Sequence, residues 1–268
     1  MKVLFFKKSL FTFIVVIILI IITTILIFHI NKSKENSKEE INNIEDIAII
    51  PPDECKCNDL EKFKQRDDFL KAQYRKKKLV ALTFDDGPSE YSSILIDELK
   101  KRDVVATFFV LGSEVKKHPE TLKFAYDTGN EIGIHSYEHK LFTKLSQDEI
   151  LNQVSKTKNI IFELTSKNPE LIRVPYGTLN KDVDKVLNTQ NLTNVLWNVD
   201  SLDWRFKNTK KIYEYVMKKF KGNDIILMHD TFKTSIEAAT LIIDKLQSEC
   251  YTFVTVSEFL RIKEEVKK

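Results

Sequence analysis

The chain has few cysteines, and their number limits what they can do. Its 268 residues include only three, Cys55, Cys57 and Cys250. Three thiols cannot complete a four-cysteine zinc site, and at most one disulfide can form among them, which leaves one thiol over. The sequence does not decide which two would pair.

Glycine and proline are also scarce, with six of each, so each position is worth locating. A strong excess of charge of one sign is absent as well, because 42 Lys and Arg stand against 39 Asp and Glu, for a net charge of +3. Nucleic-acid binding usually requires a concentrated basic face, and this balance gives no reason to expect one. Hydrophobic residues make up 43% of the chain, which is enough for a substantial core.

The amino-terminal part contains one long apolar segment. Ser9–Phe28 carries no charge, and as a helix of about 20 residues it would cross roughly 30 Å of hydrocarbon. A cleaved signal peptide has a shorter apolar core of about 7–15 residues and a small-x-small cleavage site, whereas Ile, Phe and His29 occupy that place here. We therefore predict a cytoplasmic tip and a transmembrane anchor in residues 1–30, with a cleaved signal as the alternative.

The next part of the chain, residues 31–78, is polar and charge-rich and is broken by Pro51-Pro52. We interpret it as a stalk. Apolar residues at near-helical spacing within Asp59–Lys78 predict a short helix at its end. Lysines flank the apolar segment on both sides, so the positive-inside rule favours an outward-facing domain only slightly.

Residues 79–268 alternate short apolar runs with amphipathic helical patterns. About seven such strand–helix units predict a mostly parallel sheet covered by helices, either an open doubly wound sheet or a distorted (β/α) barrel. In both architectures the functional residues gather at the carboxyl ends of the strands. The predicted strands are Leu79–Phe84, Ala106–Leu111, Glu131–Ile134, Leu171–Val174, Asn194–Trp197, Asp224–Met228 and Tyr251–Val254.

Residues with metal-binding chemistry follow the first and third predicted strands. Asp85 and Asp86 are adjacent where a buried strand ends, which is costly unless a cation is present; a capped turn is the alternative. His135 and His139 are four residues apart, a metal-ligand spacing that surface histidines can also produce. Two histidines and one carboxylate would leave coordination positions open for water and substrate, as catalytic sites require.

Further polar residues follow the later strands. Arg173 cannot lose its charge, so at a strand end it is a candidate partner for a carboxylate. Asp203 and Trp204 follow the fifth predicted strand, and His229 follows the sixth. The parallel topology would bring all of these residues to one rim with the Asp pair and the two histidines.

These residues resemble the polysaccharide deacetylase family, the NodB-homology domain of carbohydrate esterases. The resemblance extends from about Lys78 to Leu260, and it departs from the family at Asn130, Ile134 and Cys250, none of them a proposed ligand. Its five motifs occur in order: Thr83-Phe-Asp-Asp-Gly-Pro88, His135-Ser-Tyr-Glu-His139, Arg173-Val-Pro-Tyr-Gly177, Asp203-Trp204 and Leu227-Met-His229.

The resemblance implies a distorted (β/α) barrel and one divalent metal ion held by Asp86, His135 and His139. Zinc is the first choice for this ion, with cobalt, nickel or manganese as alternatives. Asp85 is implied as the catalytic base that takes a proton from the attacking water, and Arg173 as the residue that keeps it ionised.

The same resemblance implies roles for residues later in the chain. His229 would protonate the departing amine, with Asp203 keeping it charged and oriented. The backbone N–H of Tyr176, which follows Pro175 in its loop, would help to hold the oxyanion. The implied pocket for the acetyl methyl group is formed by Trp204 and Leu227.

The substrate expected from the resemblance and the anchor is N-acetylglucosamine in the peptidoglycan of the cell's own wall. The protein would then be a single-pass membrane protein with an extracellular catalytic domain. Other glycans remain alternatives: N-acetylmuramic acid, an exopolysaccharide, a chitooligosaccharide or an acetyl-xylan ester. A non-catalytic wall-binding protein on the same fold is a further alternative, although loss of Asp85 or His229 would be its expected sign, and both are present.

Overall fold

The computed structural model describes residues 66–268. The predicted anchor, Ser9–Phe28, and most of the predicted stalk lie outside the described residues. Within residues 66–268, no helix combines the length and the apolar character needed to cross a membrane.

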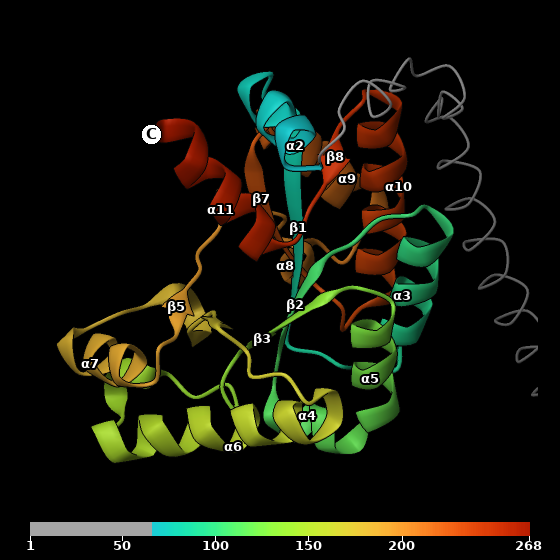
Figure 1. The fold of residues 1–268 in the computed structure, drawn as a ribbon. Helices are drawn as coiled ribbons and strands as arrows, with labels where there is room; N and C mark the ends of the chain where they lie inside the picture. The colour runs from blue at the N-terminus through green and yellow to red at the C-terminus, as the bar shows by residue number, and fades with distance from the viewer. Residues whose placement is uncertain (1–65) are drawn as a thin grey trace, which may run out of the picture. The chain divides into compact units, whose positions relative to one another are not determined.

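A single parallel sheet organises the described residues (Figure 1). Its path runs β5-β4-β3-β2-β1-β7-β6, and β8 pairs with the first residues of β1. All of its strand pairs are parallel, as the alternation of strands and helices predicts. The strands are β1 Leu79–Asp85, β2 Thr107–Val110, β3 Glu131–Ile134, β4 Leu171–Ile172, β5 Thr193–Asn194, β6 Val199–Asp200, β7 Asp224–His229 and β8 Thr252–Phe253.

The two edges of this path lie close together because the chain between them is short. Only residues 195–198 connect β5 at one edge with β6 at the other, and the five steps from Asn194 to Val199 span at most about 18 Å. The sheet therefore curls into an incomplete barrel, in agreement with the distorted barrel expected from the sequence.

The predicted strand Asn194–Trp197 is wrong in detail, because the chain changes edges within it. Val195 N–H still donates to Ile172 O of β4, at 2.8 Å, but Asn198 N–H donates to Ile225 O of β7, at 2.9 Å. The one predicted strand is thus replaced by the end of β5 and a separate strand β6, so the sheet has eight strands rather than about seven.

β1 forms the centre of the molecule. All seven of its residues are buried, as expected for a parallel strand covered on both faces. Val80, Leu82 and Phe84 belong to the larger hydrophobic cluster, while Leu79 and Ala81 belong to a second one. Successive side chains point to opposite faces of a strand, so β1 joins the two clusters.

Helices surround the sheet, and their sequences explain where they begin. A capping box at Ser146 and Glu149 starts α6, in which Ile150, Val154 and Ile161 form a buried stripe. In Figure 1, α3, α5 and α10 stand on one flank of the sheet. The helices are α2 Arg66–Arg75, α3 Ser92–Lys101, α4 Gly112–Lys117, α5 Pro119–Asp127, α6 Gln147–Thr165, α7 Lys181–Thr189, α8 Asp203–Phe206, α9 Thr209–Lys219, α10 Lys233–Ser248 and α11 Val256–Lys267, with 3-10 turns at Phe142–Lys144 and Pro175–Gly177.

The helix expected within Asp59–Lys78 is α2, and it packs against α11. Arg261 contacts Asp67 at 2.8 Å, and Lys71 contacts Glu265 at 2.8 Å. Cys250 follows α10 and is disulfide-bonded.

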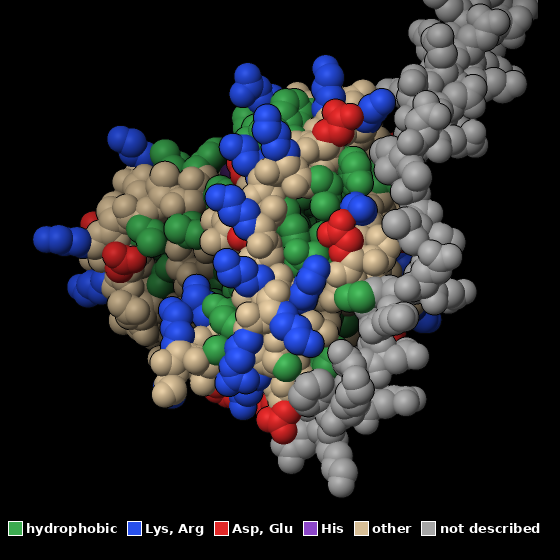
Figure 2. Space-filling model, turned by 90° about the horizontal axis from the view of Figure 1, so that it is seen from above, with side chains coloured by type: hydrophobic (Ala, Val, Ile, Leu, Met, Phe, Trp, Pro, Cys, Tyr) green, Lys and Arg blue, Asp and Glu red, His purple; other side chains and the backbone are tan. Residues whose placement is uncertain are grey.

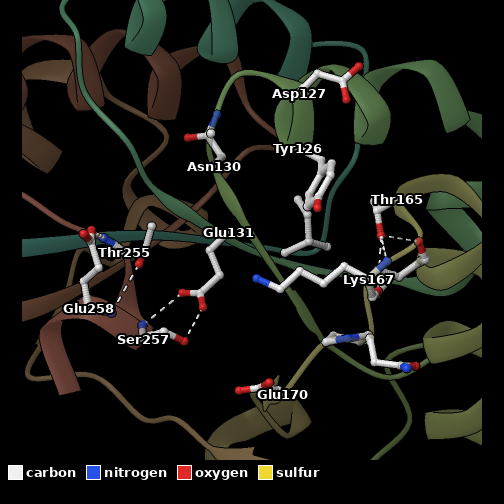
Figure 3. Close-up of a pocket in the computed structure, with 15 residues that line it drawn as sticks. Tyr126, Asp127, Asn130, Glu131, Thr165, Lys167, Glu170, Thr255, Ser257 and Glu258 are labelled. Carbon is white, nitrogen blue, oxygen red and sulfur yellow. Dashed lines mark hydrogen bonds between the residues drawn. The ribbon is translucent and has the colours of Figure 1, made fainter. Parts of the chain in front are cut away.

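Lysine and arginine are prominent at the end of the barrel where the strands begin (Figure 2). A cavity of about 700 Å³ lies at the same end, beside the start of β3 (Figure 3). Glu131 on its wall accepts hydrogen bonds from Ser257 N–H, at 3.1 Å, and from the Thr107 hydroxyl, at 3.0 Å. The cavity walls contain none of the predicted site residues, which follow the opposite ends of the strands.

Candidate metal centre and active site

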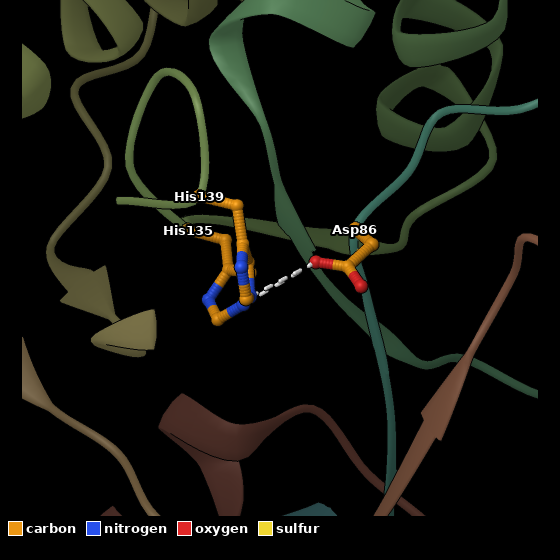
Figure 4. A group of neighbouring side chains, drawn as sticks. All are labelled: Asp86, His135 and His139. Carbon is orange, nitrogen blue, oxygen red and sulfur yellow. Dashed lines mark ion pairs between the residues drawn. The ribbon is translucent and has the colours of Figure 1, made fainter. Parts of the chain in front are cut away.

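Three predicted metal ligands meet at the carboxyl ends of β1 and β3 (Figure 4). Nε2 of His135 and Nε2 of His139 each lie 3.5 Å from Oδ1 of Asp86. One ligand atom from each residue lies within 4.8 Å of the others. The predicted pair of histidines and the predicted carboxylate are therefore brought together by the fold.

The chemistry of this group fits a divalent cation. Oδ1 of Asp86 is buried and has no hydrogen-bond partner among the described residues, which is costly unless an ion or a water satisfies it. Nδ1 of His135 donates to the carbonyl oxygen of Arg173 at 2.6 Å, so Nε2 presents its lone pair to the site. Burial lowers the pKa of His135 to about 3, which keeps the imidazole neutral, as a metal ligand must be.

The loop that carries the two histidines is held by α6. Oε1 of Gln153 accepts the N–H groups of Tyr137 and Glu138, at 3.0 and 2.9 Å. The Thr157 hydroxyl donates to the carbonyl oxygen of Ser136 at 2.8 Å. These supports were not predicted, although a glutamine and a threonine on the buried stripe of a helix are a signal that could have identified them.

Asp85 forms the predicted pair with Arg173 inside the barrel. Nη1 of Arg173 donates to Oδ1 of Asp85 at 2.7 Å, and Nε of Arg173 donates to the carbonyl oxygen of Val195 at 3.0 Å. The guanidinium also lies 4.2 Å from the ring centre of Phe109 and 5.5 Å from that of Trp197. These contacts leave Oδ2 of Asp85 facing the candidate metal ligands, 3.8 Å from Nε2 of His135.

Burial raises the pKa of Asp85 above its usual range, and the charge and hydrogen bond of Arg173 oppose that rise. Arg173 thus supports the ionised form, as expected, but burial has the larger effect. A carboxylate with a raised pKa is a stronger base than a solvated one, which suits proton abstraction near neutral pH.

His229 and Asp203 form the second predicted pair. Nδ1 of His229 lies 2.7 Å from Oδ1 of Asp203, whose Oδ2 accepts the N–H of His229 and the hydroxyl of Ser235. Burial opposes the charged form of His229, but the hydrogen bond and charge of Asp203 outweigh it and raise the pKa of His229 to about 9. The imidazole is therefore protonated at neutral pH. Its Nε2 lies 4.0 Å from Oδ2 of Asp86.

Known proteins similar to this chain identify its family. The sequence profile of the polysaccharide deacetylase family matches residues 72–195. A peptidoglycan-N-acetylglucosamine deacetylase of Bacillus cereus is 35% identical over 193 residues, which cover 70% of this chain and 90% of that protein. The chain belongs to the polysaccharide deacetylase family.

A second relative within this family is larger than the chain. The peptidoglycan-N-acetylmuramic acid deacetylase PdaC of Bacillus subtilis is 44% identical over 193 residues, which cover 72% of this chain but only 40% of PdaC. The chain thus spans about two fifths of the length of that relative. A solved structure of PdaC superposes with a TM-score of 0.68 at 42% identity, covering 71% of this chain and 93% of the solved chain.

The remaining predicted residues of this deacetylase-family chain lie on the rim and in the wall of the barrel. Tyr176 is 62% exposed and has a left-handed backbone, with φ at 61°, and its ring lies 4.7 Å from that of His139. Trp204 is half-exposed, at the start of α8. Pro175 and Leu227 are buried, and Leu227 lies beside Thr83 in the register of β7 and β1.

Two departures from the deacetylase pattern, Asn130 and Ile134, are buried at the two ends of the β3 region. Asn130 is buried before β3, where its Oδ1 accepts the N–H of Ala106 at 2.9 Å and its Nδ2 donates to Ala125 O at 3.1 Å. Ile134 is fully buried in the larger hydrophobic cluster. The carbonyl oxygen of Ile134 accepts the N–H of Arg173 at 2.9 Å, and the carbonyl oxygen of Arg173 in turn accepts Nδ1 of His135.

Proposed function

We propose that the protein is a metal-dependent deacetylase that hydrolyses N-acetyl groups of peptidoglycan. One observation carries the proposal: the convergence of Asp86, His135 and His139 on one point, with Asp85 and His229 beside it. The names of the family and of its relatives support the same reaction.

The roles of the protein's own groups follow from which atoms are free. A divalent ion bound by Asp86, His135 and His139 would polarise the acetamide carbonyl and make a water molecule more acidic. Asp85 accepts the proton at Oδ2, because its Oδ1 is occupied by Arg173. His229 donates from Nε2 to the departing nitrogen, because its Nδ1 is occupied by Asp203.

The substrate within peptidoglycan that we propose is N-acetylglucosamine. The relative in Bacillus cereus that carries this name matches the chain over 90% of its own length. N-acetylmuramic acid is the second candidate, because the more similar PdaC is named for that sugar. The ion that we propose is zinc, since two imidazole nitrogens and one carboxylate oxygen with open positions are its usual catalytic ligands.

Acetate release from purified peptidoglycan tests the reaction. We expect the purified full-length chain to release acetate, to stop when a chelator removes the ion, and to recover when zinc is restored. Chitin oligomers serve as a second substrate, and sugar analysis of the digested wall tells glucosamine from muramic acid. Activity that survives full removal of the metal, or no acetate from either substrate, would contradict the proposal.

We propose further that Ser9–Phe28 anchors the protein in the cell membrane, with the catalytic domain outside. This proposal is supported by the length of the segment and by its lack of charged residues. After a high-salt wash, the full-length chain should remain with the membrane fraction, and protease added to intact cells from which the wall has been removed should cleave the domain. A soluble chain that begins after His29 would reject the anchor.

A further inference from the structure

Asp230 is a buried carboxyl group that the reaction described above does not use. It follows His229 at the end of β7, and its side chain is only 1% exposed. Burial raises the pKa of Asp230 to about 7. Placing such a group in the interior is costly, so its contacts indicate what it stabilises.

Those contacts lead to the turn that follows Asp86. Oδ2 of Asp230 accepts a short hydrogen bond from the hydroxyl of Ser92, the first residue of α3. Its carbonyl oxygen accepts the hydroxyl of Ser89 at 2.5 Å. Ser89 N–H in turn donates to Oγ of Ser92 at 2.7 Å. The residue that follows β7 thus binds Ser89 in the turn after β1 and Ser92 at the start of α3.

A third contact is steric and lies beside the metal ligand. The carboxylate of Asp230 packs so closely on Gly87 that a β-carbon at that position would clash with both of its oxygens. On the other side of the turn, the carbonyl oxygen of Gly87 accepts Leu111 N–H at 3.0 Å. Gly87, the residue after Asp86, is therefore held between Asp230, which follows β7, and Leu111, which follows β2.

Asp86 depends on this support because its backbone conformation is unfavourable. Its φ is 73°, in the left-handed region of backbone conformation that residues other than glycine rarely adopt. Such a conformation persists only where the surrounding structure enforces it. It directs Oδ1 of Asp86 to a point 3.5 Å from both imidazoles, so a turn that relaxed would move the carboxylate away from the histidines.

We propose that Asp230 is a positioning residue that holds the turn from Gly87 to Ser92 and thereby sets the metal affinity of Asp86, His135 and His139. The inference rests on the proposed function, since it takes these three residues as the metal ligands. The same contacts fix the metal-binding turn of β1 to the end of β7 that carries His229.

The test is the zinc affinity of variants of the full-length chain, measured without substrate by competition with a chromophoric chelator. Asp230→Ala and Ser92→Ala should raise the dissociation constant on the order of 10–100-fold, as loss of groups that support a metal ligand does. Asp230→Asn retains an oxygen that accepts the Ser92 hydroxyl, so this variant should keep most of the zinc affinity of the unmodified chain. Ser92→Ala keeps the test decisive if Asp230→Ala does not fold.

Asp244→Ala is a matched control. It removes the ion pair, at 2.5 Å, of Asp244 in α10 with Arg102 at the far end of α3, and so loosens α3 away from the metal ligands. It should lower the melting temperature without changing zinc affinity. Equal zinc affinity in all variants, or a loss of zinc affinity in Asp244→Ala as large as in Asp230→Ala, would contradict the role of Asp230. Neither result would contradict the proposed function. An unmodified chain that binds no zinc would overturn both this inference and the proposed function.

Discussion

Replacing Asp85 with asparagine is expected to abolish acetate release while the chain still binds one zinc ion. Asparagine retains an oxygen for the hydrogen bond from Arg173, so the barrel interior keeps its shape. It removes the base at Oδ2, however, and proton transfer by a positioned group contributes about 10²–10⁴-fold to a rate. Acetate release and elemental analysis of the same preparation measure the two effects.

Asp200→Asn is the control for this variant. Asp200 ends strand β6, which β7 separates from β1, and its Oδ1 accepts Leu202 N–H at 2.9 Å, a bond that asparagine can also make. Most of the activity should therefore remain. If Asp85→Asn lost its zinc together with its activity, the roles of Asp85 and Asp86 would have to be exchanged.

Replacing His229 with alanine is expected to lower the rate by about 10²–10⁴-fold, because the departing amine loses its proton donor. The raised pKa also gives this residue a signature in the pH profile. His229 is protonated below about pH 9, so activity should fall as the pH rises through that value. His229→Ala should lose this alkaline limb.

Asp203→Asn should move the same limb to lower pH. The hydrogen bond and the charge of Asp203 together raise the pKa of His229, and the amide removes the charge, so burial lowers the pKa of His229 again. His118→Ala is the control, because His118 lies between α4 and α5, outside the site, and should change neither the rate nor the profile. An alkaline limb that stays unchanged in both His229→Ala and Asp203→Asn would remove His229 from the role of acid.

The choice of residues at the site was predictable because of the topology of the chain. A parallel sheet places the carboxyl ends of its strands on one rim. The residues at the ends of β1, β3 and β7 therefore had to lie near one another, namely Asp85, Asp86, His135 and His229. The same argument predicted the pairing of Arg173 with a carboxylate. Strand boundaries were less predictable, since the change of edge between β5 and β6 depends on hydrogen bonds to β4 and β7.

The sequence by itself determined the class of the fold, the family and the set of residues that meet at the rim, because these depend on local periodicity and on the order of strands. Only the tertiary structure decided which atoms of those residues are free to act. Arg173 occupies one oxygen of Asp85, Asp203 occupies one nitrogen of His229, and a main-chain carbonyl occupies one nitrogen of His135. Those partners lie far away along the chain, and the burial that shifts the pKa values of Asp85 and His229 exists only once the barrel has formed.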